Sequence, residues 1–423
     1  MATASVRIGA ATGVSPLSHR DSGTYNAPSR MPSVDMLRGA AMVLMALDHT
    51  RRFFACATFS PENLAHTSGA LFFTRFVTHF CAPIFFFLAG ASMFLAVSRG
   101  KSRTQISRYL WTRGAWLVLL DFTLIGYGWA SVFPFPHAGV VWTLGWSMIL
   151  LALVVYLPQP LIAALGVGII AFHNLFDGVD PASFGKFSLV WLLLHRPGEF
   201  QIRPRTLPFL VSFPLLPWFG VMVAGYAFGA ILLRPDRRKI LFTIGAALAI
   251  AFLVLRGFGL YGNGTASLQQ VYSDSAGPWK HQTTLALNVI AFFNTLKFPP
   301  SFQFLLMTLG PSLMALAWLD DIRFEKGIGR VLLVFGRVPF FYYVLHIYLI
   351  HTLAVWTALV LHQPVSWLLY GGYFYNPVPV GYGHGLAFIY IAWFSMVALL
   401  YLPCAWFMGL KAKHQDWWWL SYL

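Results

Sequence analysis

One apolar stretch, residues 37–54 (LRGAAMVLMALDHTRRFF), ends in a group of ionisable side chains. If a membrane helix begins near Leu37, His49 lies twelve residues along it, roughly 18 Å deep at about 1.5 Å per residue. Ionisable residues at such depth usually face a cavity or a partner, and imidazole is well suited to exchange a proton near neutral pH. His49 is therefore a candidate for general acid–base catalysis.

Asp48 and Arg52 are neighbours of this histidine with a spacing that permits an ion pair. They stand four positions apart, so both side chains lie on one helix face. We predict that Asp48 belongs to the catalytic group and that Arg52 supports its geometry. The alternative is that Asp48, Arg51 and Arg52 only mark the outer membrane interface.

Four further histidines are expected on the same side of the membrane. His66 follows in a loop, and His79 stands near the start of the next apolar stretch. His346 lies inside FFYYVLHIYLIH, three residues after Tyr343, and His351 lies nearer the outer end of this stretch. We predict catalytic roles for His66 and His346 and supporting roles for His79 and Tyr343. No pair has the HExxH spacing and carboxylates are scarce, so we predict no metal site. The alternative is that these histidines are polar links between helices.

Two basic clusters could bind phosphate groups. Guanidinium groups bind phosphate oxygens in a fork geometry, and no Walker loop or serine nucleophile elbow accompanies the clusters. The alternative is that the clusters only set membrane topology. The candidates for cofactor binding are Arg103, Arg108, Arg113, Arg237 and Arg238.

The elements that must position these residues are membrane helices. Of the 423 residues, 58% are hydrophobic and only 10% are charged, and apolar runs reach the roughly 20 residues needed to cross a bilayer. We predict an all-α, polytopic membrane helix bundle with about ten spans. They are 37–55, 70–98, 108–133, 138–157, 159–175, 215–234, 239–261, 300–319, 331–361 and 384–410. The apolar stretch 283–298 is too short and predicts an interfacial or re-entrant helix.

Charge distribution predicts the topology. Most of the 29 Lys and Arg residues fall at alternate span ends, which places both termini in the cytoplasm. We expect a disordered cytoplasmic tail over 1–30, a membrane domain over 31–411 and a short tail over 412–423. The net charge of +15 thus reflects topology, and the expected partner is a lipid bilayer and no nucleic acid. The three cysteines predict neither a disulfide framework nor a zinc site.

Four stretches, in order, resemble a known family. They are PSVDMLRGAAMVLMALDH, LFFTRFVTHFCAPIFFFLAGAS, KFPPSFQFLLMTLGPSL and VFGRVPFFYYVLHIYLIH. Together they resemble the bacterial branch of the heparan-α-glucosaminide N-acetyltransferase catalytic-domain family, over roughly residues 32–410. That family is related to membrane O-acyltransferases with an Arg-x10-His pattern.

The resemblance implies roles for individual residues. Arg38 and His49 are separated by ten residues, as in the Arg-x10-His pattern, so His49 is the implied essential histidine and Arg38 its companion. In the lysosomal branch an asparagine aligns with His49 and the active histidine follows in the loop, where His66 stands here. An aspartate of that branch is replaced here by His79. The choice between His49 and His66 as the main base therefore stays open.

The resemblance also implies the reaction. The family transfers an acetyl or other acyl group from cytosolic acyl-CoA to an acceptor across the membrane, so acyl-CoA is expected as a donor substrate and no cofactor as permanently bound. The outer segments 176–214 and 262–299 carry aromatic and hydroxyl groups suited to a carbohydrate acceptor. A hydrogen bond from His346 or Tyr343 would stabilise the oxyanion, and the acyl group would move either directly to the acceptor or through an acyl-histidine intermediate.

Two other functions are compatible with the residues alone. One is a permease for an anionic metabolite with a histidine proton relay, and the other is a membrane protein without catalysis. The expected location is a bacterial cytoplasmic (inner) membrane, and assembly into a homo-oligomer is left open.

Overall fold

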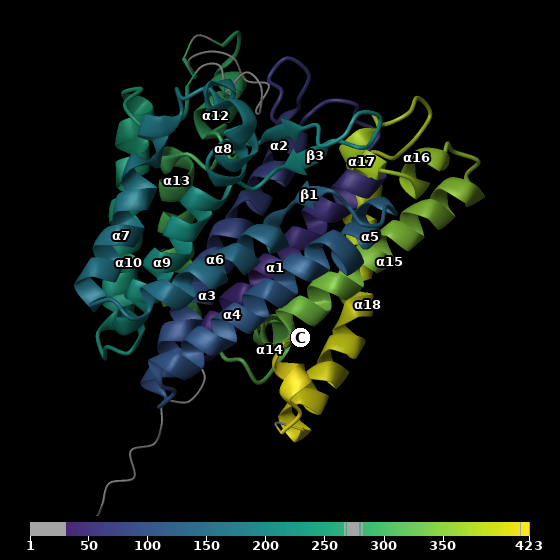
Figure 1. The fold of residues 1–423 in the computed structure, drawn as a ribbon. Helices are drawn as coiled ribbons and strands as arrows, with labels where there is room; N and C mark the ends of the chain where they lie inside the picture. The colour runs from purple at the N-terminus through teal and green to yellow at the C-terminus, as the bar shows by residue number, and fades with distance from the viewer. Residues whose placement is uncertain (1–30, 266–267, 269–278, 281, 415, 423) are drawn as a thin grey trace, which may run out of the picture.

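The structure, a computed structural model, describes residues 31–265, 268, 279–280, 282–414 and 416–422. The tail expected over residues 1–30 lies outside the described residues. Long helices run side by side between an upper and a lower face (Figure 1). The chain is a helical bundle with a few short strands at its upper end.

The first half of the chain alternates long helices with short connecting elements. They are α1 (Pro32–Phe54), α2 (Gly69–Phe76), η1 (Val77–Phe80), α3 (Cys81–Ser98), α4 (Arg103–Leu120), η2 (Asp121–Ile125), α5 (Gly126–Ala130), β1 (His137–Ala138), α6 (Val140–Val154), α7 (Gln159–Phe172), η3 (His173–Phe176), η4 (Pro181–Phe187), α8 (Ser188–Leu194), β2 (Gly198–Phe200) and β3 (Phe209–Val211).

The second half is almost entirely helical. Its elements are α9 (Leu215–Leu232), α10 (Arg237–Gly257), α12 (Leu285–Phe293), α13 (Phe302–Leu319), α14 (Gly327–Arg337), α15 (Pro339–Val360), α16 (Ser366–Leu369), α17 (Gly372–Tyr375), α18 (Leu386–Lys413) and η5 (Trp418–Ser421).

Each of the ten expected spans coincides with a helix or with consecutive helices. Among the described residues, seven helices are long and apolar enough to cross a membrane. They are Gly69–Ser98, Gln159–Phe176, Leu215–Leu232, Arg237–Gly257, Phe302–Leu319, Pro339–Val360 and Leu386–Lys413. The short stretch 283–298 contains the nine-residue α12, which is too short to span a bilayer.

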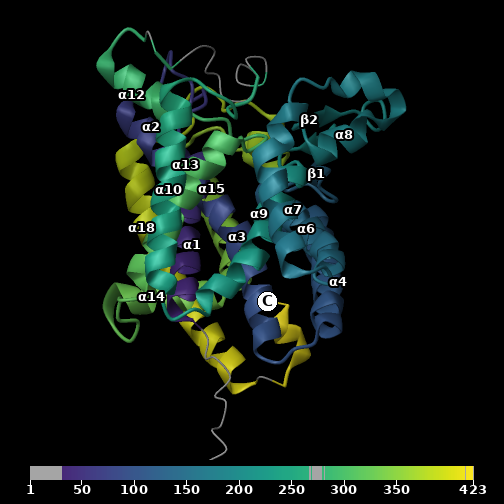
Figure 2. The same ribbon diagram turned by 90° about the vertical axis from the view of Figure 1, so that its left-hand side faces the viewer.

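Helix α1 has the length of a span but not its usual composition. It has 23 residues and carries Asp35 in its first turn and Arg51 and Arg52 in its last. It packs against α14, α15, α18 and α3, so it lies inside the bundle. Its charged side chains form ion pairs with one another and with Arg75. Figures 1 and 2 both show α1 between its neighbours.

Two glycines allow α1 and α14 to pack closely. A Cβ at Gly39 would lie 1.9 Å from the Leu332 carbonyl oxygen, and one at Gly336 would lie 1.7 Å from that of Asp35. Small residues at such crossings are typical of membrane helices. This contact fixes the first turns of α1, where Arg38 stands.

The expected span 331–361 is two helices rather than one. Helix α14 ends at Arg337 and α15 begins at Pro339, with Val338 at φ −129° and ψ 48° between them. Proline lacks an N–H and disfavours the α conformation for the residue before it, so the chain turns here.

A small sheet lies at the upper end of the bundle. Strand β3 pairs in parallel with β1 and antiparallel with β2, in the order β1-β3-β2. This sheet joins the segment between α5 and α6 to the segment before α9, and it brings residues of both segments to one end of the cavity described below.

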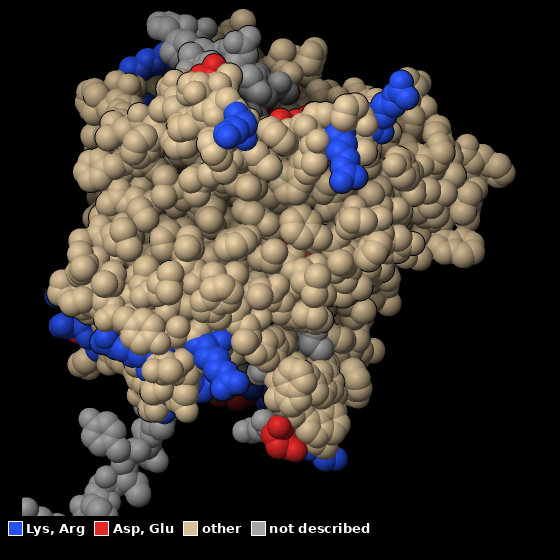
Figure 3. Space-filling view, in the orientation of Figure 1, with Lys and Arg blue, Asp and Glu red and all other residues tan. Residues whose placement is uncertain are grey.

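Charged side chains gather at the two ends of the molecule. Figure 3 shows Lys and Arg along the lower face and at the upper end, with a broad, almost uncharged band between them. Helix α18 starts beside the end of α1, since Ala55 pairs with His384, and runs back along α1. Met31 and Lys413 therefore lie at the same, lower face.

Candidate functional site

An elongated cavity of about 1260 Å³ follows α1. One stripe of the helix, spaced three or four residues apart, lines it: Arg38, Met42, Met45, His49 and Arg52. At about 1.5 Å per residue, Arg38 and Arg52 are roughly 21 Å apart along the axis. The cavity therefore extends most of the way along α1.

Two histidines meet at the wall of this cavity. The Nδ1 atom of His49 lies 2.7 Å from the Nε2 atom of His346 on α15, and their rings stack with centroids 4.9 Å apart. His49 lines the cavity, whereas His346 is fully buried behind it. The structure thus brings together two of the predicted catalytic residues.

The hydrogen bonds of this pair determine which nitrogen can act as a base. The Nδ1 atom of His346 lies 3.0 Å from the carbonyl oxygen of Tyr342, which can only accept, so Nδ1 carries the proton. When both rings are neutral, His346 Nε2 then accepts a hydrogen bond from His49 Nδ1–H. His49 keeps an unprotonated Nε2, which is the atom that a general base needs.

Aromatic side chains hold the His49 ring in place. Trp129 packs edge-on against it with centroids 4.6 Å apart, and the Trp129 indole donates a hydrogen bond of 3.3 Å to the Tyr343 hydroxyl. The Tyr343 hydroxyl therefore accepts from Trp129 and keeps its own proton to donate. Tyr343, predicted as a supporting residue, also lines the cavity.

Asp48 forms ion pairs with three arginines. Its carboxylate lies 2.9 Å from Arg51, 2.9 Å from Arg75 and 3.5 Å from Arg52. The spacing of Asp48 and Arg52 predicted the last pair, but the partner from another helix, Arg75, was not anticipated. This arrangement makes Asp48 a structural anchor beside His49, with its charge already compensated.

The network continues into the loop after α1. Arg75 lies 2.7 Å from Glu62, and His79 lies 3.5 Å from the same carboxylate. Burial alone would raise the pKa of Glu62, but the charge of Arg75, the nearby His79 and a hydrogen bond from Ser60 hold it well below its usual value. The predicted supporting residue His79 thus contacts Glu62 and does not line the cavity.

A lysine outside the set of predicted site residues also lines the cavity. Lys297 stands between α12 and α13. Burial lowers the pKa of Lys297 to about 7, and the positive charge of Arg75 adds to the effect. Near neutral pH this amine can therefore gain or lose a proton inside the cavity.

The upper end of the cavity is polar and aromatic. Its wall includes a hydrogen-bonded pair, His137 Nε2 and Ser212 Oγ at 2.9 Å, carried by and next to the small sheet. Burial lowers the pKa of His137 to about 3, so this imidazole is neutral. Glu199, Tyr373 and Phe374 complete this end.

The lower end of the cavity is basic. The cations that line it are Arg38, Arg99, Lys101, Arg113, Arg337 and Lys411. Arg38 bonds to Asp35 at 2.9 Å, to Ser92 at 2.8 Å and to the Gly336 carbonyl at 3.1 Å, which fixes its position.

Only one of the five predicted phosphate-binding arginines lines the cavity, and that is Arg113. Arg103 donates to the carbonyl of Tyr156, and Arg108 is exposed on α4. Arg237 pairs with Asp320 at 2.8 Å and Arg238 pairs with Asp321. Of the two predicted clusters, the first therefore reaches the cavity only through Arg113, and the second does not line the cavity.

His66 lies away from the histidine pair. It is exposed in the loop after α1, where it packs on Phe59. It is not among the described residues that line the cavity. The structure thus favours His49 over His66 as the base.

A comparison with known protein families tests the family resemblance that the four stretches suggest. Residues 30–259 match the family described as heparan-alpha-glucosaminide N-acetyltransferase, catalytic. The chain belongs to this family. No individual curated protein matches the chain.

The family match includes one of the two paired histidines. The matched region runs from the start of α1 to the end of α10, so it contains Arg38, His49 and Arg113. His346 lies beyond it, on α15. The protein is thus a multi-pass membrane protein of an acetyltransferase family, with its candidate base inside the matched region.

Proposed function

We propose that this heparan-alpha-glucosaminide N-acetyltransferase relative transfers an acetyl or other acyl group from cytosolic acyl-CoA to an acceptor on the opposite side of the membrane. One observation carries the proposal: the His49–His346 pair lies in the wall of a cavity that is basic at one end and polar at the other.

The lower end suits the donor. Guanidinium and ammonium groups bind the phosphates of CoA, and Arg99, Lys101, Arg113 and Lys411 line this end. A donor whose phosphates and thioester lie far apart needs an elongated cavity. The excess of positive charge at this face also favours a cytoplasmic location, where acyl-CoA is available.

The reaction moves one proton and transfers one acyl group from the sulfur of CoA to an oxygen or nitrogen of the acceptor. The unprotonated Nε2 atom of His49 takes the proton of an acceptor hydroxyl or amine, whose oxygen or nitrogen then attacks the thioester carbonyl. Tyr343 O–H donates to the developing oxyanion. The C–S bond breaks, and the CoA thiolate takes the proton back from His49. His346 orients His49 throughout.

The upper end suits a carbohydrate-type acceptor. Ser212, His137 and Glu199 offer hydrogen bonds to hydroxyl groups, while Phe374 and Tyr373 offer aromatic contacts to a sugar ring. The Arg52 guanidinium already lies over the Tyr373 ring, 4.7 Å from its centroid. These residues belong to the segments that the small sheet brings together. We infer a bacterial cytoplasmic membrane as the location.

The competing function, a permease with a histidine relay, uses the same cavity but predicts solute flux without CoA release. Sealed vesicles that contain the purified protein separate the two functions. With labelled acetyl-CoA outside and a mixture of sugars inside, we expect label on the internal sugars. Sugar uptake that does not depend on acetyl-CoA would support the permease instead. Mass spectrometry of surface glycans with and without the gene would then identify the acceptor.

A further inference from the structure

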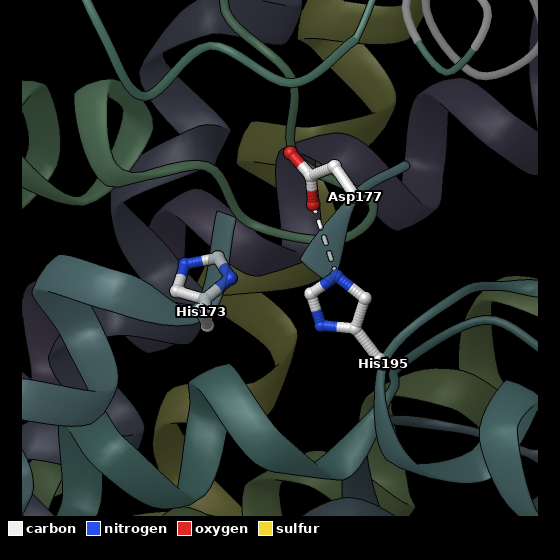
Figure 4. Close-up of side chains that lie close together, drawn as sticks. All are labelled: His173, Asp177 and His195. Carbon is white, nitrogen blue, oxygen red and sulfur yellow. Dashed lines mark hydrogen bonds and ion pairs between the residues drawn. The ribbon is translucent and has the colours of Figure 1, made fainter. Parts of the chain in front are cut away.

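Two histidines and an aspartate lie together at the upper end of the bundle, apart from the cavity residues. His173 follows α7, Asp177 follows η3, and His195 follows α8 (Figure 4). All three are buried, with exposed fractions of 1%, 3% and 1%. They are not among the described residues that line the cavity, so the proposed acyl transfer does not use them.

The hydrogen bonding of this cluster is incomplete. Within the described part of the chain, neither ring nitrogen of His173 has a hydrogen-bond partner, and the same holds for Nδ1 of His195. Buried polar groups are almost always paired because an unpaired one costs about 1–3 kcal/mol. An imidazole with two unpaired nitrogens is therefore poorly explained as an ordinary core residue.

The three side chains are spaced like metal ligands. One ligand atom from each can be chosen so that all lie within 4.8 Å of one another. Asp177 Oδ1 and His195 Nε2 are 3.0 Å apart, close to the roughly 3.3 Å between two ligands of a tetrahedral zinc ion. Movement of His173 inward would complete three ligands around one ion. A fourth position would remain for water.

A neighbouring asparagine orients the carboxylate. The Nδ2 atom of Asn174 donates to Asp177 Oδ2 at 2.8 Å, and its Oδ1 accepts from the backbone N–H of Phe302 at 2.8 Å. Such outer contacts are typical of metal sites, where they fix the ligand that they touch. They also connect the cluster to the first residue of α13.

We propose that His173, Asp177 and His195 bind one divalent first-row transition metal ion, with Zn²⁺ as the expected occupant. Two imidazoles and a carboxylate suit this class of ion, whereas Ca²⁺ and Mg²⁺ prefer oxygen ligands. The ion connects the ends of α7 and α8. His195 lies just before Pro197 and Gly198, which line the cavity. The ion therefore stabilises the part of the cavity wall at the start of β2. This proposal is independent of the proposed acyl transfer.

Metal content tests the site directly. The full chain, purified in detergent without a polyhistidine tag, should contain about one transition-metal ion per molecule by elemental analysis. His173→Gln, Asp177→Asn and His195→Gln should each lower the affinity at least about 10-fold and lose the ion on dialysis. The control is His362→Asn. His362 is exposed, lies outside the cluster and has a positive φ, which asparagine tolerates. This variant should keep the ion.

A second measurement covers the case in which the variants fail to fold. Co²⁺ added to the metal-stripped wild type should produce visible ligand-field absorption that saturates near one equivalent. A chelator should lower the unfolding temperature of the wild type. No bound ion in the wild type together with no cobalt absorption, or equal metal content in the wild type and all three variants, would overturn the proposal.

Discussion

His49 and His346 are separated by 297 positions in the chain, and their ring nitrogens lie 2.7 Å apart. The contact joins α1 to α15 at the wall of the cavity. Because the Tyr342 carbonyl fixes the tautomer of His346, the contact also determines which nitrogen of His49 is free to accept a proton. The predictions for catalysis depend on this relationship.

Replacement of His49 should abolish most of the transfer. We expect His49→Ala to lower kcat about 100-fold or more, because a general base contributes about 10²–10⁴-fold. His66→Ala should keep most of the activity, since His66 is exposed and away from the cavity. The measurement is CoA thiol release from acetyl-CoA, with His362→Asn as a control. A large loss in His66→Ala with activity retained in His49→Ala would reverse the assignment.

His346 should act through His49 rather than on the substrate. His346→Leu removes the acceptor for His49 Nδ1–H, so we expect kcat to fall about 10-fold or more, equal to about 1.4 kcal/mol, with an unchanged KM for acyl-CoA. His346→Gln keeps an acceptor oxygen and should restore part of kcat. Steady-state kinetics of both variants provide the measurement. Equal losses in the two variants would contradict this orienting role.

The cations at the lower end should bind the donor. We expect the double variant Lys101→Gln, Arg113→Gln to raise the KM for acyl-CoA about 10-fold, because charge-assisted hydrogen bonds contribute about 1.5–3 kcal/mol. The matched control is Arg108→Gln on the same helix, because Arg108 is exposed and outside the cavity lining. An equal rise in KM for the control would point to a general charge effect instead.

The ion-pair network around Asp48 should contribute to stability. Arg75→Met leaves the carboxylates of Asp48 and Glu62 without their shared partner, and breaking a buried pair costs about 3–5 kcal/mol. We expect a clear drop in unfolding temperature in detergent. Arg234→Met, which removes an exposed pair with Asp236, should have no measurable effect. Similar unfolding temperatures for the two variants would show that the network is not stabilising.

The buried amine of Lys297 should make stability depend on pH. Its pKa is about 7 in the folded protein and about 10.4 in an unfolded chain. Between these values the unfolded chain binds a proton that the folded one lacks, so the free energy of unfolding rises with pH. The unfolding temperature of the wild type should therefore rise between about pH 7 and pH 10 relative to that of Lys297→Met. The control, Lys186→Met, changes an exposed lysine and should follow the wild type. Parallel curves for the wild type and Lys297→Met would contradict this shift.

The arrangement of helices could be predicted well because it depends on local composition. Apolar runs of membrane length predict helices, and each expected span coincides with helix in the structure. Seven helices of the described residues are long and apolar enough to cross a membrane. The break at Pro339 is not predicted, although proline is a local signal, because the apolar run continues through it. The small sheet has no such signal, since its strands contain only two or three residues.

The candidate site could be predicted only in part because its contacts come from distant segments. His49 and His346 were selected by residue type and depth, but their pairing depends on how α15 packs against α1. Arg75 could not be assigned to Asp48 for the same reason. The sequence does not predict the cluster of His173, Asp177 and His195, because His195 follows Asp177 by eighteen residues and lies at the end of a different helix. The pattern HExxH, by contrast, lies within a single helix.

The most direct test of the proposed acyl transfer is the reaction itself, measured on purified protein with labelled acetyl-CoA and a sugar acceptor mixture. We expect the wild type to release CoA thiol and to label the acceptor, and His49→Ala to do so at least about 100-fold more slowly. Equal CoA release by the wild type and His49→Ala, or none by either when the wild type is folded, would contradict it.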